Sequence, residues 1–125
     1  MKNNFEDKVK IYFDSKENII RGYFLGDSNE QIAKFQSSLL KNFYEKFDQK
    51  ERLVLIDLTK AGKADSKARR VYAEALRDTK VIKYAFLVKN RILKMTVSFI
   101  FSVAEVPNVK IFENEREAIN WLKKK

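Results

Sequence analysis

Residues 52–58, Arg-Leu-Val-Leu-Ile-Asp-Leu, form a nearly continuous apolar run close to the middle of the chain. Runs of this kind belong to strands that are covered on both faces, usually at the centre of a parallel sheet. A second run spans residues 81–88 and is broken only by Lys83 and Tyr84. Parallel neighbours need a crossover between them, so the two runs predict an α/β fold with a helix in the intervening residues.

A hairpin is expected before the first of these runs. Val9, Ile11 and Phe13 alternate with more polar residues, which is the period of a half-buried strand. Residues 14–18 are rich in turn formers, and residues 19–25 predict the second strand of the hairpin. The sheet should therefore have an antiparallel edge.

The first helix is expected over residues 29–47. Its start is marked by Ser28 and Gln31, which have the spacing of a capping box. Apolar residues three or four apart should form the inner face of the helix: Ile32, Phe35, Leu39, Phe43 and Phe47.

The remaining elements follow from the same patterns. We expect a loop over 59–64, a helix from Asp65 or Ser66 to Thr79, a helix from Asn90 to about Ala104, a strand over 109–112, and a final helix capped by Asn114. The predicted order is ββαβαβαβα. It describes a single α/β domain over residues 1–125, with a mixed, mostly parallel sheet of about five strands, an N-terminal hairpin and four helices.

The composition excludes several kinds of chemistry. The 125 residues include no cysteine and no histidine, which rules out thiol nucleophiles, Ser-His-Asp triads and sites built on His or Cys metal ligands. Gly22, Gly26 and Gly62 fit no glycine-rich phosphate loop. We therefore expect a non-enzymatic protein with no catalytic residue, no cofactor and no bound metal.

The chain also lacks the features of an exported or membrane-spanning protein. Its first eight residues contain no apolar core of the kind that a signal peptide needs. The longest apolar stretch, residues 96–106, is interrupted by polar side chains and is too short to cross a bilayer. A cytoplasmic location without a transmembrane segment is the expectation.

Three segments carry a resemblance to a known family. The buried strand ends in Asp57-Leu58-Thr59, the next helix starts at Asp65-Ser66, and residues 114–122 read Asn-Glu-Arg-Glu-Ala-Ile-Asn-Trp-Leu. Together with the element order, they resemble the STAS domain of bacterial anti-sigma factor antagonists. The nearer match is its SpoIIAA-like branch, also described as STAS and CRAL-TRIO-like, and it covers nearly the whole chain.

The resemblance implies a regulatory loop. In STAS antagonists an Asp-Ser-Ser-Gly motif holds a serine that a partner kinase phosphorylates. Asp65 and Ser66 match its first two positions, whereas Lys67 and Ala68 replace the second serine and the glycine, so we expect this switch to be lost. The alternative to any regulatory role for Asp65 and Ser66 is that they only cap the helix, since Asp and Ser dominate such positions. The residues kept as a candidate docking loop are Asp57, Thr59, Asp65, Ser66 and Lys67.

The helix over residues 90–104 is unusually apolar around most of its circumference. A surface helix needs only one apolar stripe. Either the monomer buries the additional residues, or they meet a partner, a second copy or a lipid-like ligand. The candidate apolar interface consists of Ile92, Met95, Phe99 and Val103.

The chain is basic, with 26 Lys and Arg against 17 Asp and Glu and a net charge of +9. Such a charge suits nucleic acid or an anionic membrane, but the basic residues are spread out, with one cluster at Lys63, Lys67, Arg69 and Arg70.

On the resemblance, our first hypothesis is a STAS/SpoIIAA-like interaction domain that docks to a protein partner or forms a homodimer. Binding of a hydrophobic ligand or lipid in a CRAL-TRIO-like manner is the alternative, and nucleic-acid binding is the weakest hypothesis.

Overall fold

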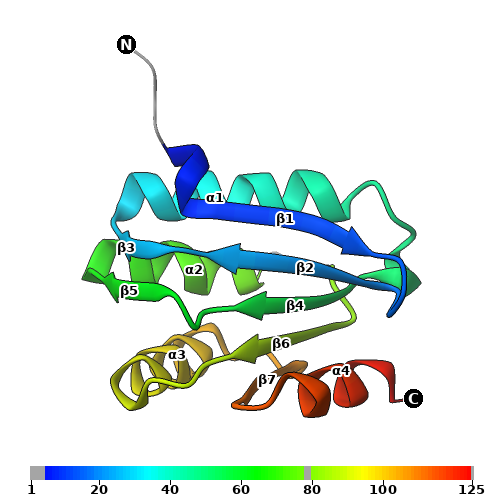
Figure 1. Ribbon diagram of the computed structural model, residues 1–125. Helices are drawn as coiled ribbons and strands as arrows, with labels where there is room; N and C mark the ends of the chain where they lie inside the picture. Colours follow the sequence, from blue (N-terminus) through cyan, green and yellow to red (C-terminus); the bar gives the residue numbers. More distant parts are fainter. Residues whose placement is uncertain (1–4, 78–79, 125) are drawn as a thin grey trace.

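The computed structural model of the chain describes residues 5–77 and 80–124. Its main sheet has five strands in the order β1-β2-β4-β6-β7 (Figure 1). They are β1 (Val9–Asp14), β2 (Ile19–Phe24), β4 (Leu53–Asp57), β6 (Lys83–Leu87) and β7 (Val109–Phe112). β1 and β2 are antiparallel, and the other neighbours are parallel. The predicted α/β class, the mostly parallel sheet and the opening hairpin are confirmed.

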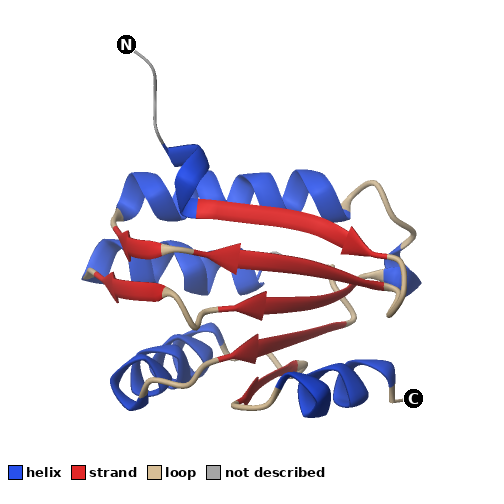
Figure 2. Ribbon diagram, in the orientation of Figure 1, coloured by secondary structure: helices blue, strands red, loops and turns tan. Residues whose placement is uncertain are grey.

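In the described part of the chain, four α-helices cover the sheet (Figure 2). They are α1 (Glu30–Tyr44), α2 (Ser66–Arg77), α3 (Arg91–Ala104) and α4 (Glu115–Lys123), with short 3-10 helices at Phe5–Lys8 and Gln49–Glu51. The alternation of side chains along β4 separates two cores. Val54 and Ile56 pack in the core beneath α1, α2 and α3, whereas Leu55 packs against α4 on the opposite face. The expected burial of β4 on both faces is therefore confirmed.

A second, two-stranded sheet lies beyond the carboxyl ends of β2 and β4, at the left of Figure 1. It pairs β3 (Gly26–Ser28) with β5 (Ala61–Ala64), so the prediction that residues 59–64 form a loop is wrong. The pairing depends on a close approach: Asp27 Oδ1 accepts the Lys63 amide at 2.8 Å, and a Cβ atom on Gly62 would lie 2.0 Å from that oxygen. Strands this short, and this poor in apolar residues, show no period in the sequence.

The helix starts are set by side-chain caps. Asn29, rather than Ser28, caps α1 by accepting the Ile32 amide at 2.9 Å, because the Ser28 side chain points elsewhere. Asn90 and Asn114 cap α3 and α4 as predicted. The expected end of the second helix at Thr79 lies outside the described residues, within which α2 extends to Arg77.

The inner face of α1 differs from the prediction by about one residue. Leu39 is 40% exposed, whereas Gln36, a polar residue, is 1% exposed. The buried stripe is Ile32, Ala33, Gln36, Leu40 and Tyr44. The shift arises because α1 packs against both the sheet and α2. Phe43 and Phe47 pack beside the edge strand instead, where the Phe47 ring stacks on Phe13 at a centroid distance of 4.9 Å.

Two groups of ion pairs tie the hairpin to α4. Arg21, which is buried, donates to Asp14 Oδ2 and to Glu115 Oε1, each at 2.9 Å. Glu17 accepts from Arg116 at 3.1 Å and from Lys123 at 3.2 Å. These two donors hold the pKa of Glu17 below its usual value. The last helix is thus fixed to residues about one hundred positions earlier in the chain.

Candidate functional site

The two halves of the predicted docking loop are each bonded locally. Asp57 Oδ1, at the end of β4, accepts the amide of Thr59 at 2.8 Å and its hydroxyl at 2.6 Å. This is a local turn of the kind that Asp commonly forms. The carboxylate is therefore engaged in holding the chain as it leaves the strand.

At the start of α2, Asp65 Oδ1 accepts the Ala68 amide at 2.9 Å and so caps the helix. Ser66 and Lys67 are exposed residues of the first turn. The strand β5 lies in the chain between this turn and Asp57. A role of these residues in docking stays a prediction, and the cap is the function that the observed hydrogen bonds support.

Only some side chains of the basic cluster at the start of α2 are exposed for contact with a ligand or partner. The Arg69 guanidinium donates to the Ala64 carbonyl at 2.6 Å, so it holds β5 against the helix. Lys63, Lys67 and Arg70 are exposed. A nucleic-acid interface at this cluster stays a prediction.

The third helix presents three different sides. Val97, Ile100 and Ala104 are buried against the sheet. Lys94, on another side, pairs with Glu113 at 3.2 Å. The remaining side carries the predicted interface, which we term the α3 strip; its residues are Ile92, Met95, Phe99 and Val103, with exposures of 76%, 69%, 59% and 43%. Their spacing of three and four residues places them next to one another along the helix.

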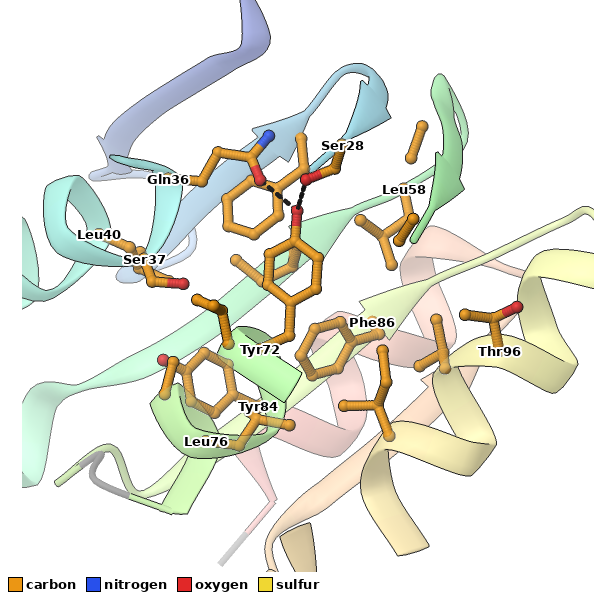
Figure 3. Close-up of a pocket in the computed structure, with 18 of the residues that line it drawn as sticks. Ser28, Gln36, Ser37, Leu40, Leu58, Tyr72, Leu76, Tyr84, Phe86 and Thr96 are labelled. Atoms are coloured by element: carbon orange, nitrogen blue, oxygen red, sulfur yellow. Dashed lines mark hydrogen bonds between the residues drawn. The ribbon is translucent and has the colours of Figure 1, made fainter. Parts of the chain in front are cut away.

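A cavity of about 520 Å³ lies between the sheet and the three helices that cover its first face. Its floor is formed by apolar side chains of β2, β4 and β6, such as Ile56 and Phe86. The small sheet β3–β5 closes one end with Ser28 and Ala61, and α3 contributes Thr96 (Figure 3). Most of the lining is apolar.

Besides the hydroxyl residues Ser37, Ser38 and Thr96, the lining of this cavity includes one hydrogen-bonded polar cluster. The hydroxyl of Tyr72 donates to Gln36 Oε1 and lies 2.7 Å from Ser28 Oγ (Figure 3). Gln36 Nε2 in turn donates to the Lys8 carbonyl at 2.9 Å. Burial raises the pKa of Tyr72 to about 12, so the phenol stays neutral at physiological pH. The group links α2, α1 and β3 at one point.

Sequence reasoning did not find this group. Tyr72 lies within the predicted second helix, where its sequence neighbours give no sign of a polar partner. Gln36 sits between Phe35 and Leu39 of the predicted stripe, and the capping-box spacing assigns Ser28 to the helix start. The available signal was a glutamine at the centre of an otherwise apolar face, since a buried polar side chain requires a partner.

Within residues 5–77 and 80–124, none of the helices combines the length and the hydrophobicity of a membrane span.

The chain has a STAS/SpoIIAA-like α/β fold. A SpoIIAA-like protein of the DUF3478 family from Shewanella loihica PV-4 superposes with a TM-score of 0.68 at 16% identity, covering 91% of this chain and 93% of that one. The anti-sigma factor antagonist SpoIIAA in its unphosphorylated form superposes with a TM-score of 0.62 at 10% identity, covering 94% and 99%. At these identities the likeness establishes the fold.

Residues 27–125 match the model of the family described as "Domain of unknown function (DUF7793)", and the chain belongs to that family. A search of curated proteins found no match.

Proposed function

We propose that the protein is a non-enzymatic interaction domain that docks to a protein partner through the α3 strip. The observation that carries this proposal is the exposure of four large apolar residues side by side on one helix, Ile92, Met95, Phe99 and Val103. Contiguous exposed apolar surface on a soluble domain marks a site of interaction. Methionine and phenylalanine are also common at adaptable interfaces.

The charge of the chain favours an acidic partner over a second copy. Two copies with a net charge of +9 each repel one another. Arg91, at the start of α3, is exposed, and Arg77 of α2 donates to the Val103 carbonyl at 3.2 Å, beside the strip. Glu105, at the end of the helix, is the neighbouring acid. The expected partner presents an apolar surface within an acidic environment.

The test compares two adjacent positions on α3. Phe99→Glu places a charge in the strip, and Ser98→Glu places the same charge on the neighbouring exposed side of the helix. Proteins retained from cells of the source organism by the immobilised wild-type chain are identified, purified, and titrated against all three forms. We expect at least one partner whose affinity falls more than about tenfold for Phe99→Glu and is unchanged for Ser98→Glu.

Two results would contradict the proposal. One is that every purified partner binds Phe99→Glu as tightly as the wild type. The other is that light scattering finds a wild-type dimer that Phe99→Glu converts to a monomer, because the strip would then serve a second copy of the chain.

A further inference from the structure

The cavity beneath α2 is large for a domain of 125 residues. Protein interiors are close-packed, and voids larger than a water molecule are few. A volume of about 520 Å³ falls within the range of small-molecule binding sites. Two of the residues that α1 and α2 contribute to its lining are small, Ser37 on α1 and Ala75 on α2. Larger side chains at these positions would fill the space.

The interior of the cavity carries no full charge. Of its lining residues, Lys34, Lys41 and Glu74 are charged, and all three are exposed at the side where α1 and α2 meet. Lys34 is also paired with Glu30 at 3.4 Å. Burial of a charged ligand group without a partner is strongly unfavourable. The interior therefore favours a neutral molecule.

The hydrogen bonds among Ser28, Tyr72 and Gln36 determine which hydrogen-bonding group a ligand in the cavity can use. Tyr72 has one hydroxyl proton and donates it to Gln36. The single proton of the Ser28 hydroxyl can go to the Tyr72 oxygen at 2.7 Å or to the Asn29 carbonyl at 3.3 Å. As a donor, the Ser28 hydroxyl keeps its acceptor lone pairs, and Ser28 lines the cavity. A ligand O–H or N–H in the cavity can donate to these lone pairs.

From these observations we infer that the cavity is a binding site for a neutral, mainly apolar small molecule with one hydroxyl or N–H group, which donates to the Ser28–Tyr72 hydroxyl pair. Affinity comes from apolar contact with the floor of the cavity, including Ile56 and Phe86. Orientation comes from the single hydrogen bond. This site is separate from the α3 strip, because Phe99 and Ile92 do not line the cavity.

Three probes that share one ring system test the ligand class: 1-naphthol, naphthalene and 1-naphthalenesulfonate. With the wild-type chain we expect 1-naphthol to bind with a dissociation constant below about 1 mM. Backbone amide signals of Ser28, Tyr72 and Thr96 should shift in heteronuclear NMR spectra. Naphthalene should bind several-fold more weakly, since it lacks the donor, and the sulfonate should leave these signals unchanged.

Variants locate the binding. Ala75→Phe should fill the space, lower the affinity for 1-naphthol more than about tenfold, and leave the melting temperature unchanged or higher. Ser37→Leu, on the facing helix, is the second filling variant if Ala75→Phe fails to fold. Ser28→Ala should reduce 1-naphthol binding to the level of naphthalene. Phe99→Glu should bind 1-naphthol within about twofold of the wild type, which separates this site from the docking proposal.

Three outcomes would overturn the inference. The first is an absence of shifts at the cavity residues with both neutral probes. The second is shifts confined to Ile92, Met95 and Phe99, which would place the probe on the α3 strip. The third is binding of the sulfonate at the cavity as tightly as 1-naphthol, since the interior would then accept an anion.

Discussion

Ser28 Oγ and the Tyr72 hydroxyl lie 2.7 Å apart, although the two residues are forty-four positions apart in the sequence. The first belongs to β3 and the second to α2, so this hydrogen bond joins the small sheet to the helix layer. The same Tyr72 hydroxyl donates to Gln36 of α1. The Tyr72 oxygen therefore connects two helices and a strand through hydrogen bonds.

Replacing that oxygen should destabilise the fold measurably. Tyr72→Phe removes the hydroxyl that donates to Gln36 Oε1. Because the Gln36 side chain is buried, its carbonyl oxygen is left without this hydrogen bond in the variant. We expect a loss of about 1–2 kcal/mol in the free energy of unfolding, measured with urea. Gln36→Leu in the same background should cost less than it does alone, because its partner is already absent. Strict additivity of the two losses would show that the hydrogen bond contributes nothing.

The pairs between the hairpin and α4 should make the protein acid-sensitive. The amide of Glu17, followed by Arg21, lowers the pKa of Asp14 below its ordinary value of 3.8, and Arg116 and Lys123 lower that of Glu17 below 4.5. A carboxylate whose pKa is lower in the folded state stabilises above its unfolded pKa, and this contribution is lost as pH falls through the folded value.

Urea unfolding from neutral pH to about pH 3 should therefore show falling stability below about pH 4.5. Glu17→Gln should make that fall shallower, because one of the two responsible carboxylates is removed. An unchanged slope in this variant would mean that Glu17 titrates alike in the folded and unfolded chain. Glu45→Gln, at an exposed position after α1, serves as the control.

Adjacent positions on α3 should respond in opposite ways to the same substitution. Phe99 is 59% exposed and Ile100 is 7% exposed. Phe99→Glu should change the free energy of unfolding by no more than about 0.5 kcal/mol. Ile100→Glu buries an unpaired charge and should cost several kcal/mol or prevent folding. Comparable melting temperatures for the two variants would show that this side of α3 is not arranged as described.

The start of α2 offers another matched pair. Asp65→Ala removes the cap on the Ala68 amide and should cost about 1 kcal/mol, whereas Ser66→Ala should cost less than about 0.5 kcal/mol. Incubation with cell lysate and ATP should leave Ser66 unmodified, because the second serine and the glycine of the STAS motif are absent. Mass spectrometry that finds substantial phosphate on Ser66 would contradict the loss of the switch.

The contact between Gly62 and Asp27 predicts a non-additive pair. In Gly62→Ala the new methyl group meets Asp27 Oδ1, so the carboxylate must rotate and lose the Lys63 amide. We expect a cost of about 1–2 kcal/mol. Asp27→Ala loses the same hydrogen bond, and the double variant should therefore cost little more than either single one. A double variant that loses the full sum would place the strain elsewhere, for example at the Asp27 amide.

The sequence was most informative where periodicity and burial coincide. The runs at 52–58 and 81–88 became β4 and β6, because buried parallel strands need apolar side chains on both faces. Asn90 and Asn114 marked helix starts correctly, since a cap is a local interaction between near neighbours.

Features that depend on tertiary contacts were not predictable in this way. The aromatic period of residues 29–47 placed Leu39 inside and overlooked Gln36, because the burial of Gln36 depends on a tyrosine from another helix. The pairing of β3 with β5 rests on a glycine that admits Asp27. The cavity lies between several elements, and its volume is set by how they pack together. No single segment of the sequence carries a signal for that packing.

The position of α4 has a consequence for synthesis of the chain. Until residues 115–123 have left the ribosome, the face of the sheet formed by Ile19, Leu55 and Leu87 has no helix to cover it. During that interval Arg21 has Asp14 as a partner but still lacks Glu115. Exposed apolar strands in a nascent chain are prone to aggregate. The growing polypeptide should therefore bind chaperones until α4 has emerged and packed against this face of the sheet.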